Sequence, residues 1–190
     1  MYKESLADWI PDTQARRAPL DTAALVQYLA AYQPELLKRV LQLSLEGVGA
    51  SSGGIAIIGE DGQVTCGALA YAGKVFAPPL QQLAETVEHG LAGWVIENRE
   101  AVLISSTRDD PRWLARDWDQ GKNPSRSAIS VPLAVDKRVF GALTLVHPRP
   151  GQFNEDDLTL LRTAGACISF DPHAFSAPAS PFTKDPSPLN

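Results

Sequence analysis

The residues best suited to chemistry lie in one segment, between positions 105 and 127. Hydroxyl, carboxylate and guanidinium groups gather there with two tryptophans, Trp113 and Trp118, five positions apart. Indole rings stack on planar molecules, and an arginine such as Arg112 or Arg116 can clamp a carboxylate or phosphate with paired hydrogen bonds. The same residues also have structural uses, because indoles fill apolar space and short polar side chains cap turns. Both interpretations stay open on the sequence alone.

The rest of the chain has no recognisable catalytic motif. It lacks a nucleophile-elbow sequence, a phosphate-binding glycine-rich loop and HExxH. Its two cysteines, Cys66 and Cys167, stand far apart in apolar segments and match no metal-binding spacing, so we expect buried thiols in a reducing compartment. The three histidines are expected to be solvated surface residues. We therefore predict no catalytic residue, no metal and no cofactor, and expect that the chain is not an enzyme.

Composition argues against several classes of partner. The chain has 190 residues, of which 44% are apolar and 21% charged, enough to build a core without a disulfide or metal. Its 17 basic and 22 acidic side chains give a net charge of −5, which opposes binding to phosphate backbones or anionic lipid. The apolar runs are strand-sized, and residues 1–8 contain no apolar stretch of signal-peptide length. A cytoplasmic protein that binds neither nucleic acid nor membranes is expected.

Apolar periodicity predicts the elements that position the 105–127 segment. Steps of three and four predict helices over 21–48, 80–89 and 90–97, and a last helix that begins at the N-cap Asn154. Pro34 should split or kink the first helix. β-Rich runs predict five strands at 54–59, 63–71, 101–104, 126–133 and 139–146, with the first two and the last two as hairpins. This pattern indicates an α+β fold with a largely antiparallel five-stranded sheet.

The two ends of the chain differ in composition from its middle. Residues 1–19 mix prolines and arginines and are expected to form a flexible arm, and residues 171–190 read as a Pro/Ser-rich disordered tail. A single domain over 20–170 lies between them. The connection over 105–125 is too long for a plain loop, so it should contain a short helix or cover something. Pro132 is tolerable only near a strand end, an edge or a bulge.

Several fragments, in their order and spacing, resemble a GAF domain. Among them are Ser52-Gly-Gly-Ile-Ala-Ile-Ile58, Gly90-Leu-Ala-Gly-Trp-Val95, Ser130-Val-Pro-Leu133 and Phe153-Asn-Glu-Asp-Asp-Leu158. The resemblance extends from about Pro34 to Phe170. It implies a sheet with helices packed on one face and a pocket on the other, covered by the loop between the third and fourth predicted strands. It does not imply a particular ligand.

The GAF family includes cyclic-nucleotide binders, bilin photoreceptors, haem sensors and a methionine sulfoxide reductase. The lysine that ends the fifth strand of cyclic-nucleotide binders is absent here, where His147-Pro148 stands. No cysteine lies between Gly67 and Ala166, which removes the thiols used for bilin attachment and for the reductase reaction. The chain is therefore not a recognisable member of the cyclic-GMP, bilin or sulfoxide-reductase groups.

Two functional hypotheses follow from this resemblance. In the first, a non-catalytic sensory or regulatory domain binds an unidentified small molecule and signals in trans to a protein partner through its terminal helices. The residues expected to line its pocket are Tyr71, Leu91, Ala92, Ser105, Trp113, Trp118 and Ser127. In the second, the pocket is occluded and the fold serves dimerisation or docking through the apolar stripe of 21–48 and the last helix. A homodimer is expected.

Overall fold

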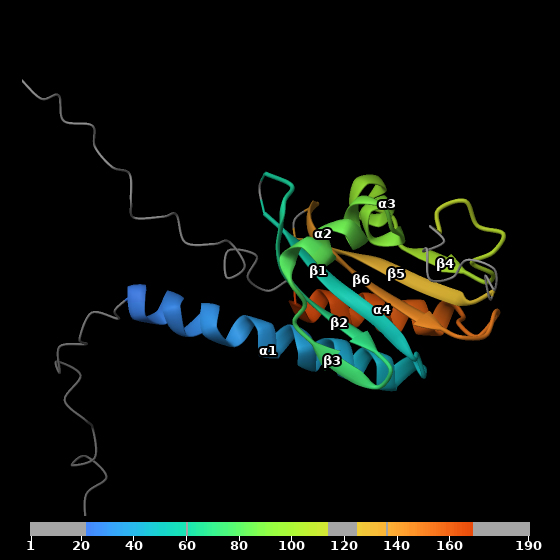
Figure 1. Ribbon diagram of the computed structural model, residues 1–190, viewed down its shortest axis with the longest axis horizontal. Helices are drawn as coiled ribbons and strands as arrows, with labels where there is room; N and C mark the ends of the chain where they lie inside the picture. The colour runs from blue at the N-terminus through green and yellow to red at the C-terminus, as the bar shows by residue number, and fades with distance from the viewer. Residues whose placement is uncertain (1–21, 60, 114–124, 136, 169–190) are drawn as a thin grey trace, which may run out of the picture.

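The computed structural model describes residues 22–59, 61–113, 125–135 and 137–168 (Figure 1). In chain order its elements are α1 (Thr22–Val48), β1 (Ser52–Ile58), β2 (Val64–Tyr71), β3 (Lys74–Phe76), α2 (Leu80–Glu88), α3 (Leu91–Asn98), β4 (Val102–Ile104), β5 (Ser127–Val135), β6 (Arg138–His147) and α4 (Glu155–Ile168). The predicted arm over 1–19, the predicted tail over 171–190 and Trp118 lie outside the described residues.

Six strands form one antiparallel sheet in the order β3-β2-β1-β6-β5-β4. This confirms the α+β class and both predicted hairpins, but the count of five strands is wrong by one. The additional strand, β3, follows β2 after the two-residue turn Ala72-Gly73, whose φ angles are 50° and 75°. Positive φ at both positions is the backbone of a type I′ hairpin turn. Alanine rarely adopts positive φ, so the sequence predicts no such turn at Ala72, and the predicted strand stops at Tyr71.

One face of the sheet carries large aliphatic side chains and packs against α1 and α4. Ile57, Leu143 and Leu145 on the strands are all 0% exposed, as are Leu41 on α1 and Leu161 on α4. Side chains alternate between the faces of a strand, so the residues between these point the other way. The main core therefore lies between the sheet and the two terminal helices.

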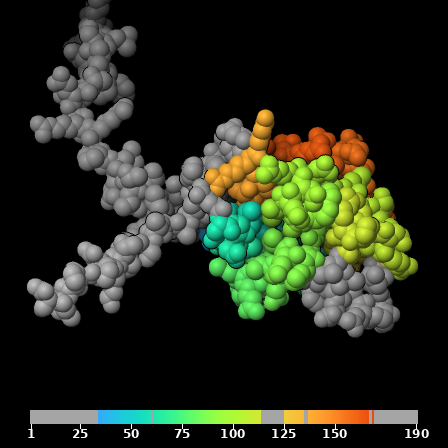
Figure 2. All heavy atoms as spheres, turned by 90° about the horizontal axis from the view of Figure 1, so that it is seen from above, coloured from blue at the N-terminus to red at the C-terminus, as the bar shows by residue number. Residues whose placement is uncertain are grey.

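The opposite face carries α2 and α3, which Figure 2 shows side by side in green from above. Leu91, Ala92 and Val95 of α3 pack there against Ala128 and Ala142 of the sheet. The structure thus adds two helices to the face on which only a covering loop was expected. No helix in the described part of the chain is both long and apolar enough to cross a membrane.

Pro34 lies inside α1, which continues from Thr22 to Val48. Of the two predicted outcomes, a split and a kink, the split does not occur. Proline removes one main-chain hydrogen bond and crowds the preceding turn. The turns that follow are held by Leu37 and Leu41, both 0% exposed, so packing on the sheet outweighs that local cost.

The start of α4 confirms the predicted N-cap. The side-chain oxygen of Asn154 accepts hydrogen bonds from the backbone N–H groups of Asp156 and Asp157, at 2.8 and 3.1 Å. The Asp157 carboxylate in turn accepts one from the Asn154 backbone N–H at 2.9 Å. This reciprocal arrangement satisfies donors that the first turn of a helix leaves without partners.

Gly93 sets how closely α2 and α3 approach each other. A Cβ atom placed on Gly93 would overlap the carbonyl oxygen of Val87 in α2. The two helix backbones therefore come so close here that only a residue without a Cβ atom fits. Gly93 lies on α3 between Leu91 and Val95, the residues that pack on the sheet. The position of α3 over the sheet therefore depends on this contact.

Replacing Gly93 by alanine should destabilise the domain by about 2 kcal/mol or more, because backbone must shift to admit the methyl group. Gly47→Ala is the matched control, since its Cβ would meet only the Leu160 side chain at 3.4 Å, an ordinary contact. That change should not destabilise the domain and can raise the free energy of unfolding by up to about 1 kcal/mol, because alanine favours a helix more than glycine does. Urea denaturation followed by circular dichroism measures both, and equal effects would refute the role of Gly93.

Candidate functional site

The sheet face beneath α2 and α3 is lined by small side chains. Ala128 and Ala142 are 0% and 1% exposed. Ser130 on β5 and Thr144 on β6 form a hydrogen bond between their hydroxyl groups, at 2.7 Å. Ser130 is 0% exposed, so this pair satisfies buried polar groups that would otherwise cost free energy. Short side chains here allow α3 and the residues after β4 to approach the sheet closely.

The segment that follows β4 is tied at its base to the start of β5. The Thr107 backbone N–H donates to the Arg126 carbonyl at 2.8 Å, and the Arg126 N–H donates to the Thr107 hydroxyl at 3.0 Å. The hydroxyls of Ser106 and Ser125 lie 2.7 Å apart. Thr107 is only 2% exposed. The two ends of this long connection therefore meet, as in a compact surface loop.

Asp110 and Arg112 join this segment to α3. The Arg112 side chain donates two hydrogen bonds to the Asp110 carboxylate, at 2.8 and 2.6 Å, and its guanidinium carbon lies 5.0 Å from the centre of the Trp94 ring. The paired guanidinium lowers the pKa of the Asp110 carboxyl, and the carboxylate raises the pKa of Arg112. Arg112 was expected to be able to clamp a ligand, but its guanidinium already has partners within the chain.

Trp113 packs against the cluster formed by α3, β4 and the sheet, to which Leu91 and Ala92 also belong. Its indole N–H is fully buried and has no hydrogen-bond acceptor among the described residues. A buried donor without an acceptor costs free energy and is uncommon in native proteins. The N–H of Trp113 is therefore the one buried side-chain polar group of the described chain that calls for an acceptor.

The structure brings together only some of the residues predicted to line the pocket. Leu91, Ala92 and Trp113 share one cluster. Tyr71 is 73% exposed on β2, three strands away from β5 in the sheet order, a separation of roughly 14 Å at the usual strand spacing. The sequence pattern could not show this separation, because it does not give the order of the strands.

The two predicted serines hold the connection between β6 and α4. The carbonyl of Ser105 accepts a hydrogen bond from the Gly151 N–H at 2.8 Å. The Ser127 hydroxyl donates to the Arg149 carbonyl at 2.8 Å and accepts from the Gln152 N–H at 3.4 Å, while Ser127 is 0% exposed. Their observed contacts are internal, and their role toward a ligand stays a prediction.

The described residues contain no cluster of metal ligands and one free cysteine, Cys66. No group of three or more His, Cys, Asp or Glu side chains gathers there as a metal site would require. Cys66 is partly buried on β2, and this burial raises the pKa of its thiol. The side chain of Cys167 lies outside the described residues.

Comparison with known proteins identifies the family. The GAF domain profile matches residues 32–170, which include every strand described above. The chain is a member of the GAF domain family. It is also 27% identical over 138 residues to the peroxide stress-activated histidine kinase mak3 of Schizosaccharomyces pombe. That alignment covers 71% of this chain but only 6% of the kinase, so this GAF domain corresponds to a small part of that protein.

Solved structures with the same fold include enzymes. The type II free methionine-R-sulfoxide reductase of Thermoplasma acidophilum matches with a TM-score of 0.58 and 15% identity, over 78% of this chain and 97% of the reductase. The free methionine-R-sulfoxide reductase of Neisseria meningitidis matches with a TM-score of 0.53 and 19% identity, over 83% and 93%. Identities this low show a shared fold alone. They nevertheless overturn the prediction that the chain is not an enzyme, because this fold does support catalysis.

The Asp110–Arg112 pair predicts a pH-dependent contribution to stability. Because the folded-state pKa of Asp110 is lowered, its contribution is complete above the unfolded value of about 3.9 and is lost as pH falls through the folded value. Asp110→Asn should therefore cost about 1 kcal/mol at neutral pH and nothing in strong acid. In an Arg112→Gln background the same substitution should have little effect. Urea titrations across pH test this, and a difference that does not diminish as the pH falls below about 3.9 would contradict it.

Proposed function

We propose that this GAF domain is a sensory or regulatory module that binds a small organic molecule beside Trp113. Its kinship with part of a histidine kinase favours a role in signalling. The observation that carries the proposal is the buried indole N–H of Trp113, which lacks an acceptor in the described chain. A ligand that presents a carbonyl or another acceptor to this N–H would form the missing hydrogen bond and so lower the free energy of the site.

The cluster against which Trp113 packs is apolar, which favours a largely apolar guest. Leu91 and Ala92 supply apolar surface beside the indole, and the small Ala128 and Ala142 floor the same cluster. Most ligand sites combine such a lining with a few polar groups that fix orientation. In this arrangement the indole orients the guest by its N–H and contacts it by its ring.

The hydrogen bonds around the site offer a route from a ligand to α4. Ser105 and Ser127 both bind the β6–α4 connection, through Gly151, Arg149 and Gln152. This connection leads directly into the capped start of α4. A guest that shifts the base of the 105–127 segment would thereby bias the position of α4, which the proposal assigns to signalling in trans with a protein partner.

Denaturing extraction of the purified full chain, followed by mass spectrometry, tests whether a small molecule is retained. The best binder found there, or in a thermal-shift screen of metabolites, should then bind Trp113→Phe about tenfold more weakly, since the substitution removes one buried hydrogen bond. Trp94→Phe is the matched control, because it makes the same chemical change under Arg112 and should leave affinity nearly unaltered.

Two results would refute the ligand-binding proposal. One is the absence of any retained or screened molecule that raises the melting temperature. The other is equal affinity of wild type and Trp113→Phe for the molecule that does bind.

A second candidate function, homodimerisation, is favoured by exposed leucines on the terminal helices. Leu36 and Leu43 on α1 are 51% and 49% exposed, and Leu160 on α4 is 42% exposed. A Cβ on Gly47 of α1 would lie 3.4 Å from Leu160, so the two helices present these side chains on one continuous surface. The N-terminal half of α1 also runs past the sheet (Figure 1). We propose that this surface joins two copies of the chain.

Leu43→Gln combined with Leu160→Gln should raise the dimer dissociation constant by about tenfold or more, because burial of leucine supplies over 1 kcal/mol per side chain. Leu80→Gln is the control, since Leu80 is equally exposed, at 51%, but lies on α2 at the other face. Sedimentation equilibrium measures the three proteins. A wild-type chain that is monomeric at high concentration would exclude this function.

A further inference from the structure

β5 has an open edge over the second half of its length. β6 pairs with it from Ser127 to Val135, whereas β4 pairs only with Ala128, Ile129 and Ser130. β4 is the last strand of the sheet, so no other described strand flanks β5 beyond Ser130 on that side. Main-chain groups on an open edge can pair with another extended chain.

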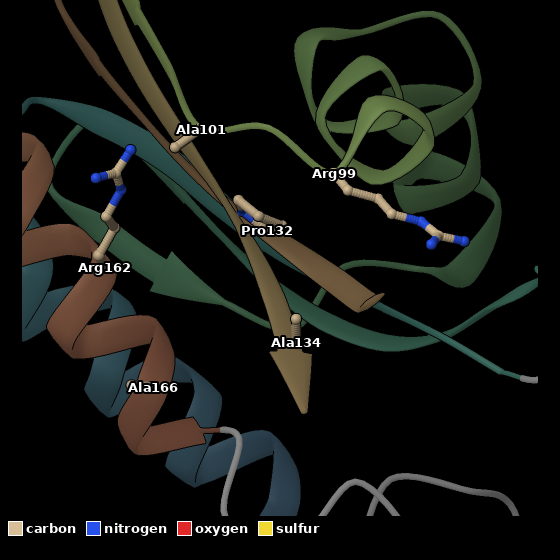
Figure 3. A pocket seen from close by; sticks show the side chains of 6 residues that line it. All are labelled: Arg99, Ala101, Pro132, Ala134, Arg162 and Ala166. Atoms are coloured by element: carbon tan, nitrogen blue, oxygen red, sulfur yellow. The ribbon is translucent and has the colours of Figure 1, made fainter. Parts of the chain in front are cut away.

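A hollow of about 270 Å³ lies beside this edge (Figure 3). Its lining comes from the end of α3 with the linker to β4, from β5 and from α4, and consists of Arg99, Ala101, Pro132, Ala134, Arg162 and Ala166. Four of these six residues are alanine or proline, so the floor is apolar and shallow. The hollow lies at the start of β4, whereas the segment with Trp113 follows the end of that strand.

The two polar side chains of the hollow are both cationic. Arg99 and Arg162 are exposed, and neither guanidinium has a hydrogen bond or ion pair within the described chain. Figure 3 shows the guanidinium of Arg162 extending from α4 toward Ala101, while that of Arg99 turns away at the opposite rim. A carboxylate beside Arg162 would therefore meet an uncompensated positive charge.

The edge itself limits what can pair with it. Pro132 has no N–H to donate, and the strand is irregular between Leu133 and Ala134. Proline at an edge discourages long strand addition. A guest can thus form only a few main-chain hydrogen bonds and must draw further affinity from side-chain contacts, of which the arginine offers the strongest.

We propose that this hollow docks a short, extended acidic segment of a partner protein, with one carboxylate on Arg162 and its backbone along β5. A guanidinium binds a carboxylate through paired hydrogen bonds, and short-chain residues between the acids would fit over the alanines. The open strand edge favours a peptide over a free small anion, because only a peptide can use the main-chain groups as well. The site goes beyond the proposed ligand function and does not depend on it.

Fluorescence anisotropy of the full chain with a labelled peptide, Thr-Glu-Val-Glu-Thr, tests the proposal against the amide peptide Thr-Gln-Val-Gln-Thr. The acidic peptide should bind about five- to tenfold more tightly, and Arg162→Gln should remove that difference. Arg149→Gln is the matched control, since Arg149 is also exposed but lies on the β6–α4 connection. Unchanged melting temperatures would show that both variants are folded.

Hydrogen exchange gives a second measurement that a merely electrostatic effect would not move. The acidic peptide should slow exchange of backbone amides between Val131 and Val135 and leave β1 and β2 unchanged. The proposal is overturned if both peptides bind alike, if Arg149→Gln weakens binding as much as Arg162→Gln, or if succinate binds as tightly as the peptide. Slow exchange, without peptide, of those 131–135 amides that do not donate to β6 would also overturn it, since the edge would then already be occupied.

Discussion

The structure depends on the unequal size of the side chains on the two faces of the sheet. Ile57, Leu143 and Leu145 fill the face beneath α1 and α4, while Ala128 and Ala142 stand on the other. Successive residues of a strand point to opposite faces. The same strands therefore build a dense core on one face and a surface of small side chains on the other. The short helix α3, which lies close to α2 at Gly93, packs on this surface of small side chains. Trp113 and its neighbours take their positions from it.

Much of this architecture could be predicted from the sequence because it depends on local rules. The Asn154 cap, the close approach at Gly93 and the edge position of Pro132 each follow from the chemistry of one residue. Predictions failed where tertiary contacts decide. β3 depends on a positive φ at Ala72, and α1 runs through Pro34 because packing holds it. Neither feature has a local signal.

The candidate site was less predictable than the fold. The sequence singled out Trp113 for its ring, but its significance lies in the burial of its N–H, which only the packed structure reveals. Arg112 pairs with Asp110 two residues earlier, a spacing that could have suggested a local turn with an internal ion pair. The error about enzymes has another origin. The sequence lacks familiar catalytic motifs, but this does not exclude an enzyme, because one fold can support many different functions.

The brevity of β4 has a further consequence, for the dynamics of the domain. Three residue pairs attach it to the sheet, against nine between β5 and β6, so its local unfolding costs far less free energy than global unfolding. When β4 separates from β5, the apolar side of α3 would be exposed for a short time at this edge of the sheet, while the main core stays intact. Such fraying would admit solvent to this margin of the sheet before the rest of the domain unfolds.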